Sequence, residues 1–143
     1  MSVELITEAT DEVVAMMERL IPQLSRSSRP LTATQTREFL TQPNVYLFGF
    51  RTGEGEPLLG MLSLATFRIP TGLRAWVEDV VVDEDARGHG AGQALVEAAI
   101  AHAQTLGART VDLTSRPTRE AANRLYQRCG FELRETNVYR FAN

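Results

Sequence analysis

A glycine-rich loop, residues 83–92, carries the most informative chemical pattern in the sequence. Glycines stand at 88, 90 and 92, directly after Arg87, and the loop links the apolar run Val80-Val81-Val82 to an alanine-rich stretch with helical spacing. The first N–H groups of a helix lack partners within it, and the helix dipole adds positive charge there. Glycines let a bulky diphosphate approach the main chain closely, and Arg87 could add a charge-assisted contact. The pattern therefore predicts a site for a phosphate-containing ligand.

The spacing excludes two other kinds of phosphate loop. A dinucleotide fingerprint would need a glycine at 93, where the sequence has Gln93. A nucleoside-triphosphate loop needs a lysine, and all fifteen basic residues are arginines. The lack of lysine also excludes Schiff-base chemistry on a lysine side chain. A turn whose glycines serve steric needs alone is the remaining alternative.

Two adjacent carboxylates, Glu78 and Asp79, interrupt the apolar stretch just before the loop. Carboxylates in a central strand are costly to bury without a partner, so they usually have a functional or ion-pairing role. Glu78 could accept a proton from an ammonium group, and Asp79 could bind a cationic substrate or pair with Arg74. Ion pairing of both residues, without any catalytic part, is the alternative. Strict strand alternation predicts two faces: Trp76, Glu78, Val80 and Val82 on one, and Val77, Asp79 and Val81 on the other.

The elements that position these residues follow from hydrophobic periodicity and turn signals. Helices are expected from Thr10 or Asp11 to Leu24, from a capping box at Thr32 and Gln35 to about Gln42, and over 93–106 and 119–128. Strands are expected over 3–7, 44–51, 58–67, 75–82 and 110–114, with a final pair over 131–134 and 138–141. This order predicts an α/β fold with about four helices and a single mixed, mostly antiparallel sheet of about seven strands.

Composition narrows the class of protein. The 143 residues, 43% of them hydrophobic, suit a single domain spanning 1–143. A net charge of −3 argues against a non-specific nucleic-acid partner. The apolar stretches are too short to span a membrane, and the N-terminus lacks the layout of a signal peptide. A cytoplasmic location is therefore expected. One cysteine, Cys129, and two histidines offer no metal-ligand spacing, so no metal is expected.

Two segments together resemble a known family. Arg87-Gly88-His89-Gly90-Ala91-Gly92 resembles the acyl-CoA-binding motif Q/R-x-x-G-x-G/A of the GNAT superfamily of N-acetyltransferases. Ala121-Ala122-Asn123-Arg124-Leu125-Tyr126, followed by Cys129-Gly130-Phe131, is similar to the superfamily's second signature. The two signatures stand in the typical order and separation, and the resemblance covers Glu4 to Asn143. It implies one acyl-CoA N-acyltransferase domain with a GNAT-like fold, splayed between strands 4 and 5.

The resemblance also implies roles for individual residues. Val80 and Val82 would bind the pantetheine arm of acetyl-CoA through their main chains, and Asn123 would contact the same arm. Tyr126 would protonate the departing thiolate. Glu78, singled out above by its place in the apolar stretch, is the candidate base. The pyrophosphate would be held by the main-chain N–H groups of one continuous segment: Arg87, Gly88, His89, Gly90, Ala91, Gly92 and Gln93.

The expected function is therefore transfer of an acetyl group from acetyl-CoA to a primary amine, by direct attack in a ternary complex. The acceptor is either a small molecule or a peptide. The stretch 77–82 is similar to that of the glucosamine-6-phosphate acetyltransferase branch, but Thr114 stands where that branch has an acid, so its substrate is not carried over. The alternative is a non-catalytic acyl-CoA-binding or regulatory domain. Since many members of the superfamily are dimers, the resemblance leaves a homodimer open.

Overall fold

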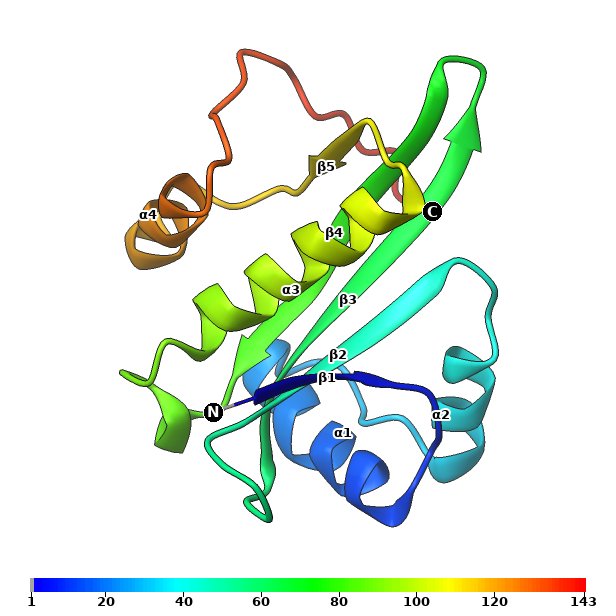
Figure 1. Ribbon diagram of the computed structural model, residues 1–143, viewed down its shortest axis with the longest axis vertical. Coiled ribbons are helices and arrows are strands. Elements are labelled where there is room, and N and C mark those ends of the chain that lie inside the picture. Colours follow the sequence, from blue (N-terminus) through cyan, green and yellow to red (C-terminus); the bar gives the residue numbers. More distant parts are fainter. Residues whose placement is uncertain (1) are drawn as a thin grey trace.

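A single five-stranded sheet organises the described part of the chain, residues 2–143 of this computed structural model (Figure 1). The strands lie in the order β1-β2-β3-β4-β5. The first four pair antiparallel, and β5 joins β4 in parallel, so the sheet is mixed and mostly antiparallel as predicted. The bounds are β1 Ser2–Ile6, β2 Val45–Arg51, β3 Leu58–Ile69, β4 Gly72–Val82 and β5 Thr110–Asp112.

Four α-helices begin and end close to the predicted positions, within the described range: α1 Asp11–Leu24, α2 Ala33–Leu40, α3 Ala91–Leu106 and α4 Glu120–Arg128. The Thr10 hydroxyl accepts from Val13 N at 3.3 Å and so caps α1. The predicted capping box of α2 is confirmed, with Thr32 and Gln35 bonding reciprocally at 3.0 and 3.1 Å. Gly107, at φ 84°, ends α3. In this part of the chain, no helix combines the length and the apolar character needed to cross a membrane.

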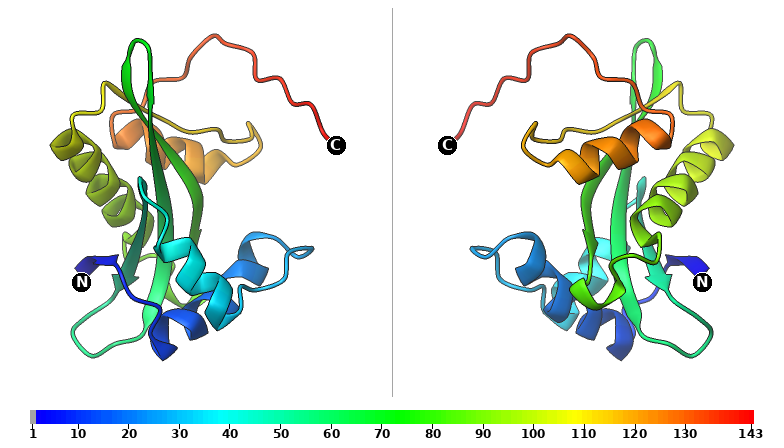
Figure 2. Two further views of the ribbon diagram at one scale, coloured as in Figure 1. Left: turned by 90° about the vertical axis from the view of Figure 1, so that its right-hand side faces the viewer. Right: turned by 90° about the vertical axis from the view of Figure 1, so that its left-hand side faces the viewer.

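The sheet has a separate apolar core on each face. Figure 2 shows α3 on one side of the sheet and α1 with α2 on the other. Leu95, Val96 and Ala99 of α3 pack with Phe50 and Leu62 in the first core. In the second core, Met16, Met17 and Leu20 of α1 pack with Leu47, Met61 and Val81. Because both faces of the central strands are covered, the near-continuous apolar run in β4 has a structural explanation.

The expected final strand pair is not formed, so the prediction of about seven strands is wrong. The last main-chain hydrogen bond joins Phe131 N to Tyr126 O at 3.0 Å, and residues 132–143 pair with no strand in the described chain. A tight hairpin needs residues at positive φ, and none between 132 and 143 has this conformation. An isolated two-stranded hairpin is also marginally stable at best. The segment instead runs extended and stands away from the body (Figure 2).

Candidate active site

β4 and β5 pair over only three residues and then separate. Arg74, Ala75 and Trp76 face Thr110, Val111 and Asp112, and no pairing with β5 follows although β4 continues to Val82. Asp83 N donates to Leu59 O of β3 at 2.8 Å. Since main-chain groups alternate between the two sides of a strand, those of Val82 point away from β3, toward the opening. The expected splay between strands 4 and 5 is thus present, and it leaves a free edge on β4 after Trp76.

A bulge at Asp79 changes which β4 side chains share a face. Ser63 pairs with Glu78 and Met61 with Val81, so Leu62 alone opposes both Asp79 and Val80. Asp79 takes φ 50°, in the left-handed region. The predicted strict alternation is therefore wrong, because the extra residue reverses the pattern. Val80 and Val82 pack in the same core as Val77, whereas Val81 contacts the core on the opposite face.

Both carboxylates of β4 are exposed, so the expected cost of burying them does not arise. Glu78 and Asp79 are exposed, whereas the other residues of β4 from Ala75 to Val82 are buried or partly buried. The predicted alternative of an Asp79–Arg74 ion pair is not formed, because Arg74 Nη2 lies 3.7 Å from Asp112 Oδ2 instead. Neither carboxylate has an ion-pair partner in the described chain. Glu78 and Asp79 are therefore free to meet a cationic group that enters from solvent.

The glycine-rich loop presents unpaired N–H groups at the start of α3. After a single 3₁₀ turn, Glu84–Ala86, Arg87 N donates to Glu84 O, and the next main-chain donor with a partner is Ala94, which bonds Gly90 O at 3.0 Å. Within residues 2–143, the N–H groups from 88 to 93 have no acceptor. Gly88 and Gly90 take φ 85° and 71°, and a Cβ added to either would meet no atom within 4 Å. The loop is thus a row of donors without protein acceptors, with open space beside Gly88 and Gly90.

Gly92 serves helix packing rather than access to the loop. A Cβ at this position would lie 3.0 Å from Leu125 Cδ2 of α4. Because glycine has no side chain, α4 can approach the first turn of α3 at this position. The contact places the second signature of the sequence beside the first, although the two are separated by the whole of α3 and β5.

Tyr126 combines a buried ring with a free hydroxyl. The residue is 8% exposed, and its ring meets Phe131 edge to face with 6.0 Å between centroids. The hydroxyl makes no hydrogen bond in the described chain and is not among its buried unpartnered atoms, so it reaches the surface. Burial raises the pKa of the Tyr126 phenol, against a smaller lowering by Arg119. The phenol therefore stays protonated through neutral pH, as a proton donor must.

The remaining predicted residues surround the same loop. Arg87, Gly88, His89 and Gly90 are exposed, whereas Ala91 is buried under the first turn of α3. The Gln93 side chain donates to Glu97 Oε1 at 2.8 Å, along the helix surface. Asn123 Nδ2 donates to Arg116 O at 3.0 Å, so the amide closes the loop before α4 and keeps its oxygen and its second N–H for a ligand.

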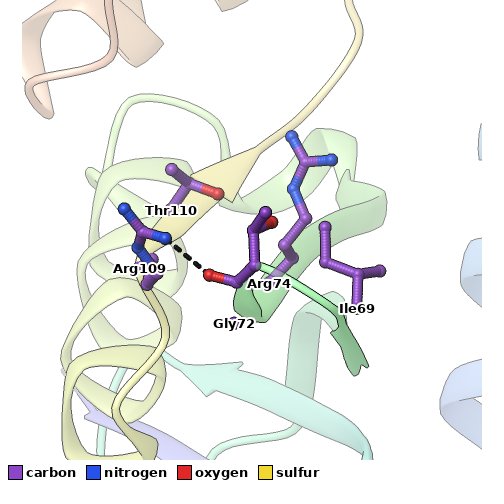
Figure 3. A pocket seen from close by; sticks show the side chains of 6 residues that line it. Ile69, Gly72, Arg74, Arg109 and Thr110 are labelled. Atoms are coloured by element: carbon purple, nitrogen blue, oxygen red, sulfur yellow. Dashed lines mark hydrogen bonds between the residues drawn. The ribbon is translucent and has the colours of Figure 1, made fainter.

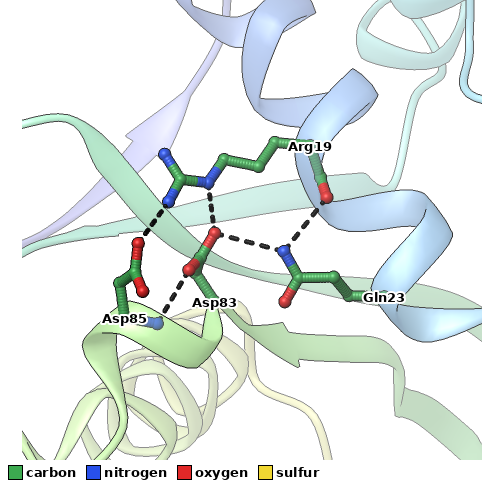
Figure 4. Close-up of polar contacts among 4 residues, drawn as sticks. All are labelled: Arg19, Gln23, Asp83 and Asp85. Carbon is green, nitrogen blue, oxygen red and sulfur yellow. Dashed lines mark hydrogen bonds and ion pairs between the residues drawn. The ribbon is translucent and has the colours of Figure 1, made fainter.

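A polar cluster that the sequence did not single out ties α1 to the glycine-rich loop (Figure 4). The carboxylate of Asp83, a buried residue at the end of β4, accepts from Arg19 Nε, from Gln23 Nε2 at 3.2 Å and from Asp85 N at 2.8 Å. Arg19 Nη2 also reaches Asp85 at 2.9 Å. Burial alone would raise the pKa of Asp83, but these hydrogen bonds outweigh it and lower the pKa. An acid that directly follows an apolar strand was the one available signal, because its side-chain partners Arg19 and Gln23 are 64 and 60 residues away.

A hollow lies at the start of β4, at the other end of the strand from the glycine-rich loop (Figure 3). The Arg109 side chain crosses over Gly72 and donates to Thr71 O, so it braces the β3–β4 turn. This contact gives Arg109 a structural role. The lining residues are Ile69, Thr71, Gly72, Arg74, Arg109 and Thr110.

The chain is similar to known proteins in both sequence and fold. Residues 11–131 match the model of the Acetyltransferase (GNAT) family. A mycothiol acetyltransferase of Propionibacterium freudenreichii subsp. shermanii is 39% identical over 57 residues, which cover 40% of this chain and 18% of that protein's length. The chain thus corresponds to less than a fifth of that relative.

Two solved structures share the fold over 99% of this chain. A putative acetyltransferase from Agrobacterium tumefaciens str. C58 superposes with a TM-score of 0.85 at 23% identity, covering 100% of that chain. An aminoglycoside acetyltransferase from an uncultured soil metagenomic sample, in complex with trehalose, gives a TM-score of 0.83 at 17% identity, covering 95% of that chain.

Proposed function

Because the chain belongs to the acetyltransferase (GNAT) family, we propose that it moves an acetyl group from acetyl-CoA to a primary amine by direct attack in a ternary complex. Family membership makes it an acetyltransferase that uses acetyl-CoA. The proposed transfer to an amine in a ternary complex rests on one observation. The N–H groups from 88 to 93 have no acceptor in residues 2–143, and they lie beside the free edge of β4.

The residues at this site fit the diphosphate and the arm of coenzyme A. The space in front of Gly88 and Gly90 is open, so a diphosphate can approach main-chain donors that have no other acceptor. Arg87 is exposed at the start of the row and can add a charge-assisted contact. The free edge of β4, including Val80 and Val82, can bond an extended amide-containing arm as an added strand would. Acetyl-CoA supplies the activated acyl group as a thioester.

Side chains and one main-chain N–H group then perform three tasks. The exposed carboxylate of Glu78 accepts the proton of the incoming ammonium, directly or through water, and Asp79 beside it attracts the cation. The N–H of Val80, next to the bulge, polarises the carbonyl under attack. The phenol of Tyr126 donates its proton to the leaving thiolate. Much of the rate comes from holding the two substrates together.

A primary amine is the acceptor class that the site favours. Glu78 and Asp79 are exposed and have no ion-pair partner in residues 2–143, so they can attract a cationic substrate, and an amine is protonated at neutral pH. The similar aminoglycoside acetyltransferase acts, by its name, on amine-bearing compounds. Either a small molecule or a peptide can present such an amine.

A panel of amines tests this function directly. The chain is mixed with acetyl-CoA and, in turn, an aminoglycoside, an amino sugar phosphate, a peptide with a free α-amine and a lysine-containing peptide, and thiol release is followed. Amine-dependent release with at least one class is expected. Binding of acetyl-CoA without release for any amine would indicate a non-catalytic acyl-CoA-binding domain and would contradict the proposal.

A further inference from the structure

The two faces of the hairpin formed by β3 and β4 are covered to different extents. Leu64, Ala75 and Val77 pack in the α3-side core. Residues paired across two antiparallel strands point to the same face, and neighbours along a strand point to opposite faces. The residues that alternate with this core set therefore share the other face, where Ser63 pairs with Glu78, Ala65 with Trp76, and Phe67 with Arg74. These paired residues are here called the open face.

The open face carries aromatic surface that the described chain leaves uncovered. Phe67 is 44% exposed, and Trp76 is half-buried but packs in neither core. Neither ring forms an aromatic pair within residues 2–143. From β3 and β4, the core beneath α1 takes in Leu58, Met61 and Val81, which lie beyond the bulge, and the hairpin extends well past α1 (Figure 1). Contiguous uncovered apolar groups mark a binding surface, whereas single ones do not.

The proposed base lies at one end of this aromatic surface. Glu78 follows Trp76 by two residues on the same face of β4, so their Cα atoms are about 7 Å apart. Phe67 is diagonal to Trp76 across the strand pair, at roughly 7–8 Å, a separation that aromatic side chains can span. A molecule whose amine is held at Glu78 therefore has both rings within the reach of a small apolar group.

The other end of the open face has no free carboxylate. Asp112 of β5 lies beside Trp76, and its Oδ2 is 3.7 Å from Arg74 Nη2, so its charge is matched within the chain. A polyamine or an aminoglycoside would place further ammonium groups over Trp76 and toward Arg74. The guanidinium repels a second cation there, and no unpaired carboxylate of the open face compensates for this repulsion. The distribution of charge thus favours an acceptor with a single amine.

We propose that the acceptor is a primary monoamine joined by a short linker to an apolar body of about the size of one ring. The amine lies at Glu78, and the body packs on Trp76 and Phe67, which determine specificity and take no part in proton transfer. Water leaves both apolar surfaces when they meet, so the body adds affinity and orients the amine. This inference rests on the proposed transfer of an acetyl group to an amine and narrows its acceptor.

The first test compares amines in thiol release from acetyl-CoA. Phenethylamine and ethanolamine are primary monoamines that differ in the apolar body, and spermidine carries additional cationic groups. The kcat/KM for phenethylamine should exceed that for ethanolamine by at least about 10-fold. Equal values for these two amines, or a preference for spermidine, would overturn the inference while transfer to an amine stands. No release with these amines or with the panel above would remove the proposed function and this inference together.

The second test uses a matched pair of variants on the exposed surface. Phe67→Ala should lower kcat/KM for phenethylamine by about 3- to 30-fold and leave that for ethanolamine unchanged. Leu5→Ala is the control, because Leu5 is 43% exposed on β1 and pairs with Phe48, so it points to the α3 side. This variant should change neither value. An equal loss for both amines in Phe67→Ala, or the same loss in Leu5→Ala, would overturn the inference.

The third test needs no turnover, because Trp76 is the only tryptophan of the chain and its emission reports on the open face alone. Coenzyme A, which has no acetyl group to transfer, is added first, followed by phenethylamine or ethanolamine. A saturable shift of the emission to shorter wavelength is expected with phenethylamine and not with ethanolamine, because the apolar body displaces water from the indole. The same response to both amines, or no response to phenethylamine, would overturn the inference even where acetyl transfer is observed.

Discussion

Arg19 of α1 donates through Nε to the buried carboxylate of Asp83, the first residue of the glycine-rich loop after β4 (Figure 4). The pair joins a helix on one face of the sheet to the segment proposed to bind the diphosphate. Asp83 also bonds Asp85 N, so the same carboxylate fixes the turn that leads into the loop. The turn that leads to the unpaired N–H groups is thus held by Arg19, a residue of α1 that lies far from the loop in the sequence.

Arg19→Gln should disturb the loop and make folding more sensitive to acid. The pKa of Asp83 is lowered in the folded chain, so the ionised carboxylate stabilises the fold above the ordinary value of about 3.8, and this contribution is lost as the pH falls through the folded-state pKa. Without Arg19 that pKa is lowered less, so the loss begins at higher pH. The acid unfolding midpoint should rise, and kcat/KM for acetyl-CoA should fall by up to about 100-fold.

The control for this prediction is Arg26→Gln, which removes an exposed arginine that has no ion pair in residues 2–143. Acid unfolding followed by circular dichroism, together with KM at neutral pH, compares the two variants. Identical midpoints and KM values would show that the Arg19–Asp83 pair does not position the loop.

Tyr126→Phe should lower turnover by about 10- to 10⁴-fold while acetyl-CoA binding is unchanged, if the phenol is the proton donor. Because burial raises the pKa of Tyr126, wild-type activity should not decline from loss of this proton until the pH exceeds the ordinary tyrosine value of 10.0. Tyr46→Phe is the control, since Tyr46 is a partly buried residue whose ring centroid lies 4.4 Å from that of His102. Equal turnover of the wild type and Tyr126→Phe would remove Tyr126 from the mechanism.

Local features of the fold were predictable from the sequence, whereas features set by distant partners were not. Thr10, Thr32 and Gly107 act on neighbouring residues, so their caps could be inferred from spacing. The bulge at Asp79 depends on the register between β3 and β4, and nothing in the residues around it signals positive φ. The final strands were expected from a pattern that residues 132–143 do contain, but no strand in the described chain pairs with them.

The same distinction between local and distant contacts holds for the candidate site. The row from Gly88 to Gln93 could be predicted because its donors are unpaired for a local reason, the start of a helix. The contact of Gly92 with Leu125 depends on how α4 returns to α3, whereas the bond of Asn123 to Arg116 is set within α4 and the loop before it. The Arg19–Asp83 pair joins residues 64 positions apart, so no spacing rule could reveal it.

Glu78→Gln should reduce activity most strongly at low pH, where more of the amine is protonated and a base is most needed. The pH profile of kcat/KM is the measurement, with Glu38→Gln on the exposed surface of α2 as the control. Because Glu78 is exposed on β4, its replacement should leave the thermal unfolding midpoint nearly unchanged. A loss of the same size at every pH would indicate that the carboxylate positions the substrate without taking its proton.

Calorimetric titration with acetyl-CoA of the wild type, Gly90→Val and Gly107→Val tests the central claim most directly. Both glycines take positive φ, at 71° and 84°, with open space around them, and they stand at opposite ends of α3, so the substitutions carry similar backbone strain. The wild type and Gly107→Val should bind acetyl-CoA, and Gly90→Val should not, because its side chain fills the space in front of the unpaired N–H groups. Wild-type affinity in Gly90→Val would contradict a diphosphate site at residues 87–93.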